Sequence, residues 1–383
     1  MLFKLAYKNL IGAGLRTWLT VGVLSFAFVI IILINGIVNG FNDQAINDAV
    51  NWEIGKGKLQ NEKYDAYDPF SIKDGHGILP DSKNKDLVPV LIRQASIYPQ
   101  GRMVSVTLNG IDINQKLLKL PTILLQQSTE EIPAIIGKRM AASANLKKGD
   151  QVLMRWRDSH GTFDAANISV AGIFNTNVTT VDAGQIWISL KKLRAMTDLD
   201  KSTTLFIAEK DYKQERIAGW KFLDQDELLK DLRAMVQIER ISDSIIYLLL
   251  LAIALLAIFD TQVLSVFRRQ REIGTYISLG MTRPQVVGLF TIEGSMNSIL
   301  AIIVGGIYGI PLFLYLSYYG IAIPAGADNM GLSMGEKITP VFGAGLVLGT
   351  ISLVVISSTI VSFLPSRKIA KMNPVDALKG KIQ

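Results

Sequence analysis

Four long apolar runs constrain the fold of this chain more than any other sequence feature. They occupy residues 17–41, 243–267, 284–318 and 341–364. As a helix, the first run would be about 37 Å long at 1.5 Å per residue, which exceeds the roughly 30 Å hydrocarbon core of a bilayer. The sequence therefore predicts a membrane protein with four transmembrane α-helices at these positions.

The segment before the first run has two interpretations. Lys4, Lys8 and Arg16 resemble the basic start of a signal peptide, but the apolar run is too long for one and no small-residue cleavage site follows. We therefore expect an uncleaved span. Residues 1–16 are predicted as a cytoplasmic interfacial helix, although an ordinary basic flank of the span fits the pattern as well.

The long polar segment after the first run has the pattern of a folded domain. Residues 42–242 contain no run long enough to span a bilayer, and strand-like and helix-like patterns alternate there. The sequence predicts a large α+β extracytoplasmic domain inserted between the first and second helices, with residues 55–86 as an irregular loop. The predicted strands are 102–108, 151–156, 168–173, 186–190 and 204–208, and the predicted short helices are 137–145 and 189–197.

The end of this domain has a helical pattern that reaches the second apolar run. In residues 222–242, apolar residues recur at helical spacing, and no Pro or Gly separates them from the run. We expect one helix that continues into the membrane as a stalk. A separate surface helix that ends near Ser242 is the alternative.

Positive charge is concentrated beside the apolar runs. The net charge is +7, and segments 1–16, 268–283 and 365–383 hold twelve Lys and Arg against two acids. Such flanking cations mark the cytoplasmic side of a membrane protein. We expect both termini, the 268–283 loop and the 365–383 tail inside, and the 319–340 loop outside. This distribution favours membrane lipids and not a nucleic acid as the partner of the basic residues.

The short basic loop between the second and third runs has an apolar side. Ile273, Tyr276, Ile277 and Gly280 share one face of a helix, and Arg268, Arg269, Arg271 and Arg283 surround that face. Such a segment is too polar for the bilayer and too short to fold alone. The pattern predicts a cytoplasmic helix that docks into another protein.

The sequence offers no nucleotide-binding or metal-binding motif. It lacks the phosphate-binding GxxxxGK[ST] motif and HExxH, it has no cysteine, and its histidines are only His76 and His160. The sequence therefore predicts no enzyme activity, no metal site and no cofactor bound by this chain.

Two acids lie within predicted spans, where charge is costly and usually faces a partner. Asp260 lies in the second span and Glu293 in the third. Three interpretations remain open for them: coupling of helix movement across a dimer interface, hydrogen bonding to neighbouring Thr, Gln or Arg, and proton transfer. Close helix packing is favoured by small residues such as Gly36, Gly40, Gly305, Gly345 and Gly349.

The motifs and their order resemble those of a known family. The stretch 271–286, which begins Arg-Glu-Ile-Gly, the stretch Phe290-Thr-Ile-Glu-Gly294, and the tail 365–378 are similar to conserved motifs of type VII ABC transporter permeases, which include the MacB, FtsX and lipoprotein-releasing Lol proteins. Three blocks in the polar domain, at 136–141, 146–150 and 170–174, resemble the family as well. The resemblance thus covers nearly the whole chain.

The resemblance implies a mechanism known as mechanotransmission. A cytoplasmic ABC ATPase dimer, which binds ATP and Mg²⁺, would bind the loop helix, and its closure would move the stalk helices and the external domain. Its coupling contacts would be Arg271, Glu272, Ile273, Gly274, Tyr276, Ile277 and Gly280. A second permease, identical or homologous, would complete the membrane part.

The resemblance also suggests a location and a substrate. We expect a multi-pass protein of the bacterial inner membrane that extracts and releases lipoproteins or moves another periplasmic substrate. MacB-like export of a drug or peptide with an adaptor is one alternative. FtsX-like activation of a cell-wall hydrolase is the other.

Overall fold

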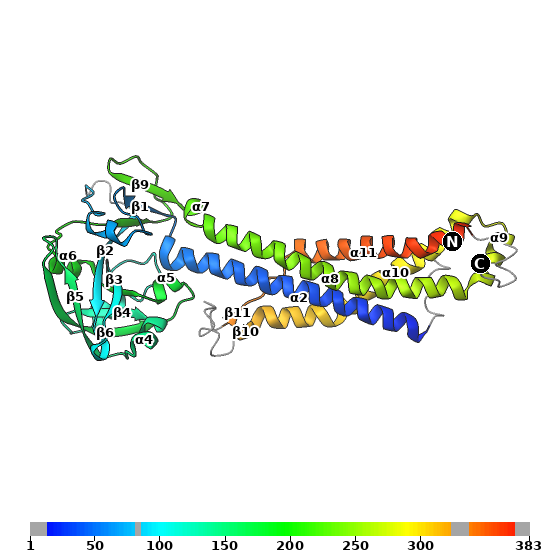
Figure 1. Cartoon of the computed structure of the whole chain (residues 1–383), viewed down its shortest axis with the longest axis horizontal. Coiled ribbons are helices and arrows are strands. Elements are labelled where there is room, and N and C mark those ends of the chain that lie inside the picture. The colour runs from blue at the N-terminus through cyan, green and yellow to red at the C-terminus, as the bar shows by residue number, and fades with distance from the viewer. Residues whose placement is uncertain (1–13, 81–85, 323–336, 372–383) are drawn as a thin grey trace. The chain divides into compact units, whose positions relative to one another are not determined.

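The structure is a computed structural model that describes residues 14–80, 86–322 and 337–371. The chain divides into two compact units. The helical unit contains residues up to Asn42, from Val236 to Ala322 and from Lys337 onward, and the α+β unit contains residues from Asp43 to Met235 (Figure 1). The predicted interfacial helix, most of the 319–340 loop and the end of the tail lie outside the described residues.

Long helices dominate the helical unit, and each predicted span lies almost wholly within one of them. All four are long and apolar enough to cross a membrane. The helices and short strands of this unit are α2 (Leu15–Ala49), α8 (Lys230–Arg268), α9 (Gln270–Ser278), α10 (Arg283–Tyr319), β10 (Ile321–Ala322), β11 (Lys337–Ile338), α11 (Ala344–Ser366) and η6 (Arg367–Lys371).

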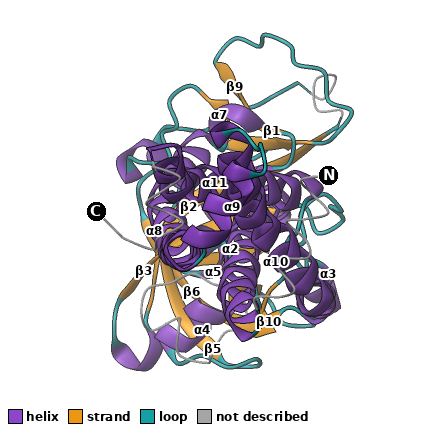
Figure 2. Cartoon of the chain, turned by 90° about the vertical axis from the view of Figure 1, so that its right-hand side faces the viewer, coloured by secondary structure: helices purple, strands orange, loops and turns teal. Residues whose placement is uncertain are grey.

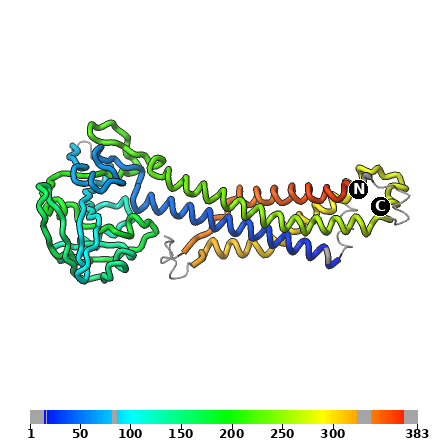
Figure 3. Tube along the Cα trace, viewed as in Figure 1, coloured from blue at the N-terminus to red at the C-terminus, as the bar shows by residue number. Residues whose placement is uncertain are grey.

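Helix α8 is continuous from the α+β unit into the helical unit, as the unbroken green trace in Figure 3 shows. The alternative of a separate helix ending near Ser242 is therefore wrong. The helix begins later than the pattern indicated, because β9 (Trp220–Asp224) and the short α7 (Gln225–Leu228) occupy the segment before Lys230.

Glycines allow close packing within the helical unit, although not at every predicted position. A Cβ atom at Gly36 would overlap the Phe342 ring, and Val341 N donates to Gly36 O at 2.8 Å. At Gly305 a Cβ atom would lie in tight contact with Phe28 of α2, at 3.0 Å. Gly345 and Gly349 of α11, for which the sequence also suggested close contacts, have open space where a Cβ would be.

The α+β unit is built on one nine-stranded sheet, drawn in orange in Figure 2. Its elements are η1 (Val50–Ile54), β1 (Gly57–Asn61), η2 (Pro69–Lys73), β2 (Leu87–Ile97), η4 (Pro99–Gly101), β3 (Val104–Ile111), α3 (Ile123–Gln127), β4 (Pro133–Gly137), α4 (Lys138–Ala144), β5 (Gln151–Arg157), β6 (Phe163–Phe174), α5 (Thr179–Asp182), β7 (Gln185–Ser189), α6 (Leu190–Thr197), β8 (Leu205–Ala208), β9 and α7. The predicted α+β class is therefore observed, and the unit lies between α2 and α8 in sequence.

Six of the strands close into a barrel. The order is β3-β7-β4-β6-β5-β2, and β2 pairs again with β3, for example Val90 with Ile111 and Ile97 with Val104. Strands β8, β1 and β9 extend the sheet beyond β2. Closure removes the free strand edges that would otherwise be able to pair with another chain.

Buried apolar side chains of the six barrel strands fill the barrel interior. Along β5, Val152, Met154 and Trp156 are buried while the residues between them are exposed. The buried side of β5 therefore faces inward, and it packs with apolar side chains of the other five strands, such as Leu91 and Ile186. Apolar alternation of this kind is the pattern by which β5 is recognised in the sequence.

The sequence pattern missed β2, β4 and β9, and it treated residues 55–86 as irregular although β1 and η2 lie there. Strand β2 is the central omission, because it pairs with β3, β5 and β8. It is buried on both faces over much of its length. Its apolar run consequently shows no alternation, and Pro89 further weakens the strand signal.

Candidate coupling site

The loop between α8 and α10 folds into a short helix, α9, with defined ends. Arg269 has non-helical backbone angles and separates α8 from α9. After α9, Gly280 turns the chain with a φ of 98°. Thr282 and Gln285 then form the capping box that starts α10, in which Thr282 N donates to Gln285 Oε1 at 2.9 Å. The predicted loop helix is therefore present.

The apolar face of α9 packs against the rest of its own unit. Ile273 is fully buried in a cluster with Val266, Val286, Phe290 and Ile369, which come from α8, α10 and η6. Tyr276 and Ile277 are half-buried against the same cluster, and Gly274 is buried. Ile273 and Gly274 are therefore not exposed to another protein in this structure, and the coupling role predicted for them stays a prediction. Their burial instead fixes α9 to the ends of the long helices.

An ion-pair network joins α9 to α10. The Arg269 Nη1 donates to both carboxylate oxygens of Glu293 at 2.9 Å, and its Nε donates to Glu272 Oε2 at 2.7 Å. The guanidinium also lies 4.9 Å from the centroid of the Phe290 ring. One side chain thus connects the first turn of α9 with the third turn of α10.

Burial makes this network sensitive to the loss of either partner. The side chain of Arg269 is 18% exposed and that of Glu293 is 9% exposed. Burial acts to lower the pKa of the Arg269 guanidinium, but the charge of Glu293 and the hydrogen bonds to Glu272 and Glu293 outweigh it and raise that pKa. The single Nη1 atom of Arg269 contacts both carboxylate oxygens of Glu293, and this contact restricts how α9 and α10 are oriented at this point.

The two intramembrane acids have different environments. The network explains Glu293 by hydrogen bonding to a neighbouring Arg, which was one of the three interpretations of the sequence. Asp260 is exposed on α8 and forms no hydrogen bond or ion pair with any residue that the structure describes. That interpretation therefore does not hold for Asp260 within the described part of the chain.

The outer surface of α9 carries the remaining predicted coupling residues and one exposed apolar residue that lies outside the predicted face. Arg271, Glu272 and Gly280 are exposed. Leu279, which the helical-face analysis did not include, is 78% exposed at the end of the helix. The helical-face analysis missed Leu279 because this residue lies directly before a glycine turn. Helical periodicity no longer determines the direction of a side chain there.

A buried polar seam lies next to this site where three long helices meet. Gln262 of α8 and Ser362 of α11 both approach Gly294 of α10 so closely that a Cβ there would overlap them. Gln262, Glu293 and Ser362 are all buried. Small residues such as Gly294 let helices approach closely, so packing holds the relative position of the three helices here.

Comparison with known proteins agrees with this arrangement of helices. The profile of the FtsX-like permease C-terminal domain matches residues 244–374, which include α9, α10, α11 and most of α8. This match and the relatives named as permeases support a place for the chain in the type VII ABC permease family. The matched segment contains Arg269, Glu293 and the whole of α9.

Three relatives are similar to parts of this permease. It is 24% identical over 293 residues, or 72% of the chain, to the pyoverdine export ATP-binding/permease protein PvdT of Pseudomonas fluorescens. It is 27% identical over 294 residues to PvdT of Pseudomonas savastanoi pv. phaseolicola. It is 26% identical over 131 residues, or 34% of the chain, to the uncharacterized ABC transporter permease MJ1507 of Methanocaldococcus jannaschii, of which it covers 30%. The chain spans 38% of the length of those two PvdT proteins.

Proposed function

We propose that this permease transmits ATP-driven movement from a cytoplasmic ABC ATPase to its own α+β unit. The observation that carries the proposal is the anchoring of α9: Ile273 and the Arg269–Glu293 pair join it to α8 and α10. A force applied to α9 therefore acts on the ends of the long helices without first deforming a loose loop. Helix α8 is continuous from this end to Lys230.

The ATPase would bind the outer surface of α9, which consists of Arg271, Glu272, Thr275 and Leu279. These four side chains are exposed, and together they present both signs of charge beside one large apolar residue. Interfaces commonly place such an apolar residue in a pocket of the partner and surround it with polar contacts. The 383 residues contain no phosphate-binding GxxxxGK[ST] motif, so we assign ATP and Mg²⁺ to the partner.

The positive-inside pattern supports a topology with α9 in the cytoplasm and the α+β unit outside the inner membrane. A second permease would pair with this one through the lipid-facing side of the helices. Asp260, exposed on α8, would find its polar partner there, because an unpaired charge in hydrocarbon is costly.

For the substrate we carry two proposals. Release of lipoproteins from the inner membrane follows from the resemblance to the Lol permeases. Export of a small molecule or peptide is favoured by the PvdT relatives, whose names describe pyoverdine export and whose similarity covers 72% of this chain in the Pseudomonas fluorescens protein. A lipoprotein that co-purifies with the complex would support the first, and a co-purifying adaptor the second.

The docking surface is tested by Leu279→Asp and Arg271→Glu. Both side chains are exposed, so we expect folded permease that loses its ATPase in co-purification, with binding about 30-fold weaker for a central contact residue. Met103→Asp is the matched control for Leu279→Asp, because Met103 is also a large exposed apolar residue and lies in the α+β unit. Normal ATPase binding by both variants would contradict the assignment.

A further inference from the structure

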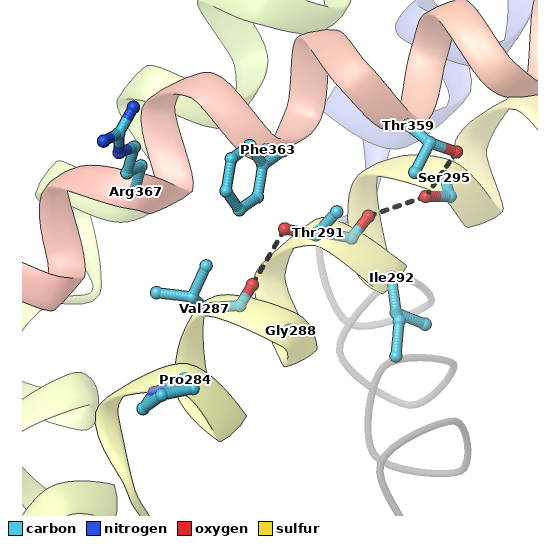
Figure 4. A pocket seen from close by; sticks show the side chains of 9 residues that line it. All are labelled: Pro284, Val287, Gly288, Thr291, Ile292, Ser295, Thr359, Phe363 and Arg367. Carbon is cyan, nitrogen blue, oxygen red and sulfur yellow. Dashed lines mark hydrogen bonds between the residues drawn. The ribbon is translucent and has the colours of Figure 1, made fainter.

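A groove runs between α10 and α11 near the end that carries α9. It has a volume of about 440 Å³, within the roughly 300–1,000 Å³ range of small-molecule sites. Figure 4 shows Val287, Gly288 and Thr291 on the α10 wall and Phe363 on the α11 wall. Arg367 lies at the end of the groove.

The groove surface is almost entirely apolar, although three of its residues carry hydroxyl groups. Thr291 Oγ1 donates to Val287 O at 2.9 Å, Ser295 Oγ donates to Thr291 O at 2.8 Å, and Thr359 Oγ1 lies 3.1 Å from Ser295 Oγ. The helices themselves therefore satisfy these hydroxyls, as the dashed lines in Figure 4 show. A ligand in the groove would therefore contact a mainly apolar surface.

The end of the groove is positively charged. Arg367 is exposed and has no ion pair among the residues that the structure describes. It follows directly after the apolar helix α11, and Arg283 is exposed at the start of α10. A guanidinium at the boundary of an apolar region matches a phosphate in geometry and charge.

We propose that this groove is a binding site for an anionic phospholipid. One acyl chain lies along Val287, Gly288 and Phe363, and the phosphate contacts Arg367. A second protein copy is a poorer match, because a stable interface buries about 800 Å² on each partner and this feature is a narrow groove. The proposal depends on α10 and α11 lying in a membrane, and it is independent of ATPase docking at α9.

Gly288 provides a selective way to close the site. A Cβ at Gly288 meets no atom within 4 Å, so Gly288→Leu would place its side chain in the groove without a clash in the fold. Gly349→Leu is the matched control, because Gly349 of α11 also has open space but does not line the groove. For the charge, Arg367→Gln is compared with Arg268→Gln, a change at the exposed end of α8.

Native mass spectrometry of the detergent-solubilised chain measures the occupancy directly, with phosphatidylglycerol and phosphatidylethanolamine of identical acyl chains as probes. We expect one phosphatidylglycerol to bind about fivefold more tightly than phosphatidylethanolamine, as one Arg contributes at an anionic surface. Arg367→Gln should abolish this preference, Gly288→Leu should reduce binding of both lipids, and both controls should behave as the wild type.

Three results would overturn the proposal. Equal binding of the two lipids would remove the role of Arg367, and unchanged binding by a normally folded Gly288→Leu variant would place the lipid elsewhere. Dimers that Gly288→Leu converts to monomers would identify a second copy of the chain as the occupant. Unaltered thermal unfolding of Gly288→Leu establishes that lost binding reflects a filled groove.

Discussion

At the residue scale, the Arg269–Glu293 pair shows how a costly charge acquires a structural role. Glu293 lies in a helix of otherwise membrane-like composition, where an isolated carboxylate would be strongly unfavourable. The pairing with Arg269 removes that cost and at the same time orients α9 against α10. The sequence shows that an acid in a span and several nearby arginines are available to pair. It did not specify which of the neighbouring arginines would turn inward, because Arg268, Arg269 and Arg271 are close together in the chain.

Glu293→Gln should destabilise the protein by about 2 kcal/mol, because a partly buried guanidinium loses its partner. The thermal unfolding midpoint in detergent measures the effect. Arg269→Gln should cost a similar amount, and the double variant should cost clearly less than the sum of the two. Glu272→Gln is the control: its side chain is 54% exposed, so its effect should stay below about 1 kcal/mol. Strict additivity of Glu293→Gln and Arg269→Gln would show that the pair contributes no coupling.

At the element scale, sequence patterns identify elements with one buried side better than elements buried all round. Strand β5 alternates between buried and exposed residues and was predicted within one residue of its ends. Strand β2, which holds the barrel closed, is buried on both faces and was missed. The apolar face of α9 was recognised, but the pattern could not distinguish contact with its own unit from contact with a partner. Periodicity predicts which face of a helix is apolar, but it does not predict which other element or protein packs against that face.

The contact between α2 and the segment before α11 is testable with two glycines of one helix. Gly36→Ala places a methyl group against the Phe342 ring, and such overpacking costs about 1–3 kcal/mol. Gly22→Ala is the matched control, because a Cβ at Gly22 meets nothing within 4 Å, and a helical Gly→Ala change is otherwise favourable by up to about 1 kcal/mol. We therefore expect a lower thermal midpoint for Gly36→Ala and an unchanged or higher midpoint for Gly22→Ala. Equal midpoints would show that Phe342 moves aside freely.

At the scale of the whole molecule, two continuous helices connect the two units. Helices α2 and α8 each begin in one unit and end in the other. A helix is stiff along its axis because consecutive turns are hydrogen-bonded, so displacement at one end of α8 is carried along it. The composition indicated the two units, and the absence of Pro and Gly indicated the continuous helix. The sequence could not show where α8 begins, because the apolar residues of β9 also fit a helical spacing.

The continuity of α8 is therefore the feature on which the proposed transmission depends. Gln237→Pro removes a backbone donor and kinks the helix at an exposed position just beyond the boundary between the units, at a cost of about 3 kcal/mol. In the purified complex, ATP hydrolysis should persist, because α9 and its anchors are unchanged. Substrate release or export in reconstituted vesicles should fall about tenfold or more, since a flexible kink absorbs the movement. Gln237→Ala, which keeps the helix intact, should retain both activities. If the Pro variant folds, hydrolyses ATP and still transports at the wild-type rate, then α8 is not the transmitting element.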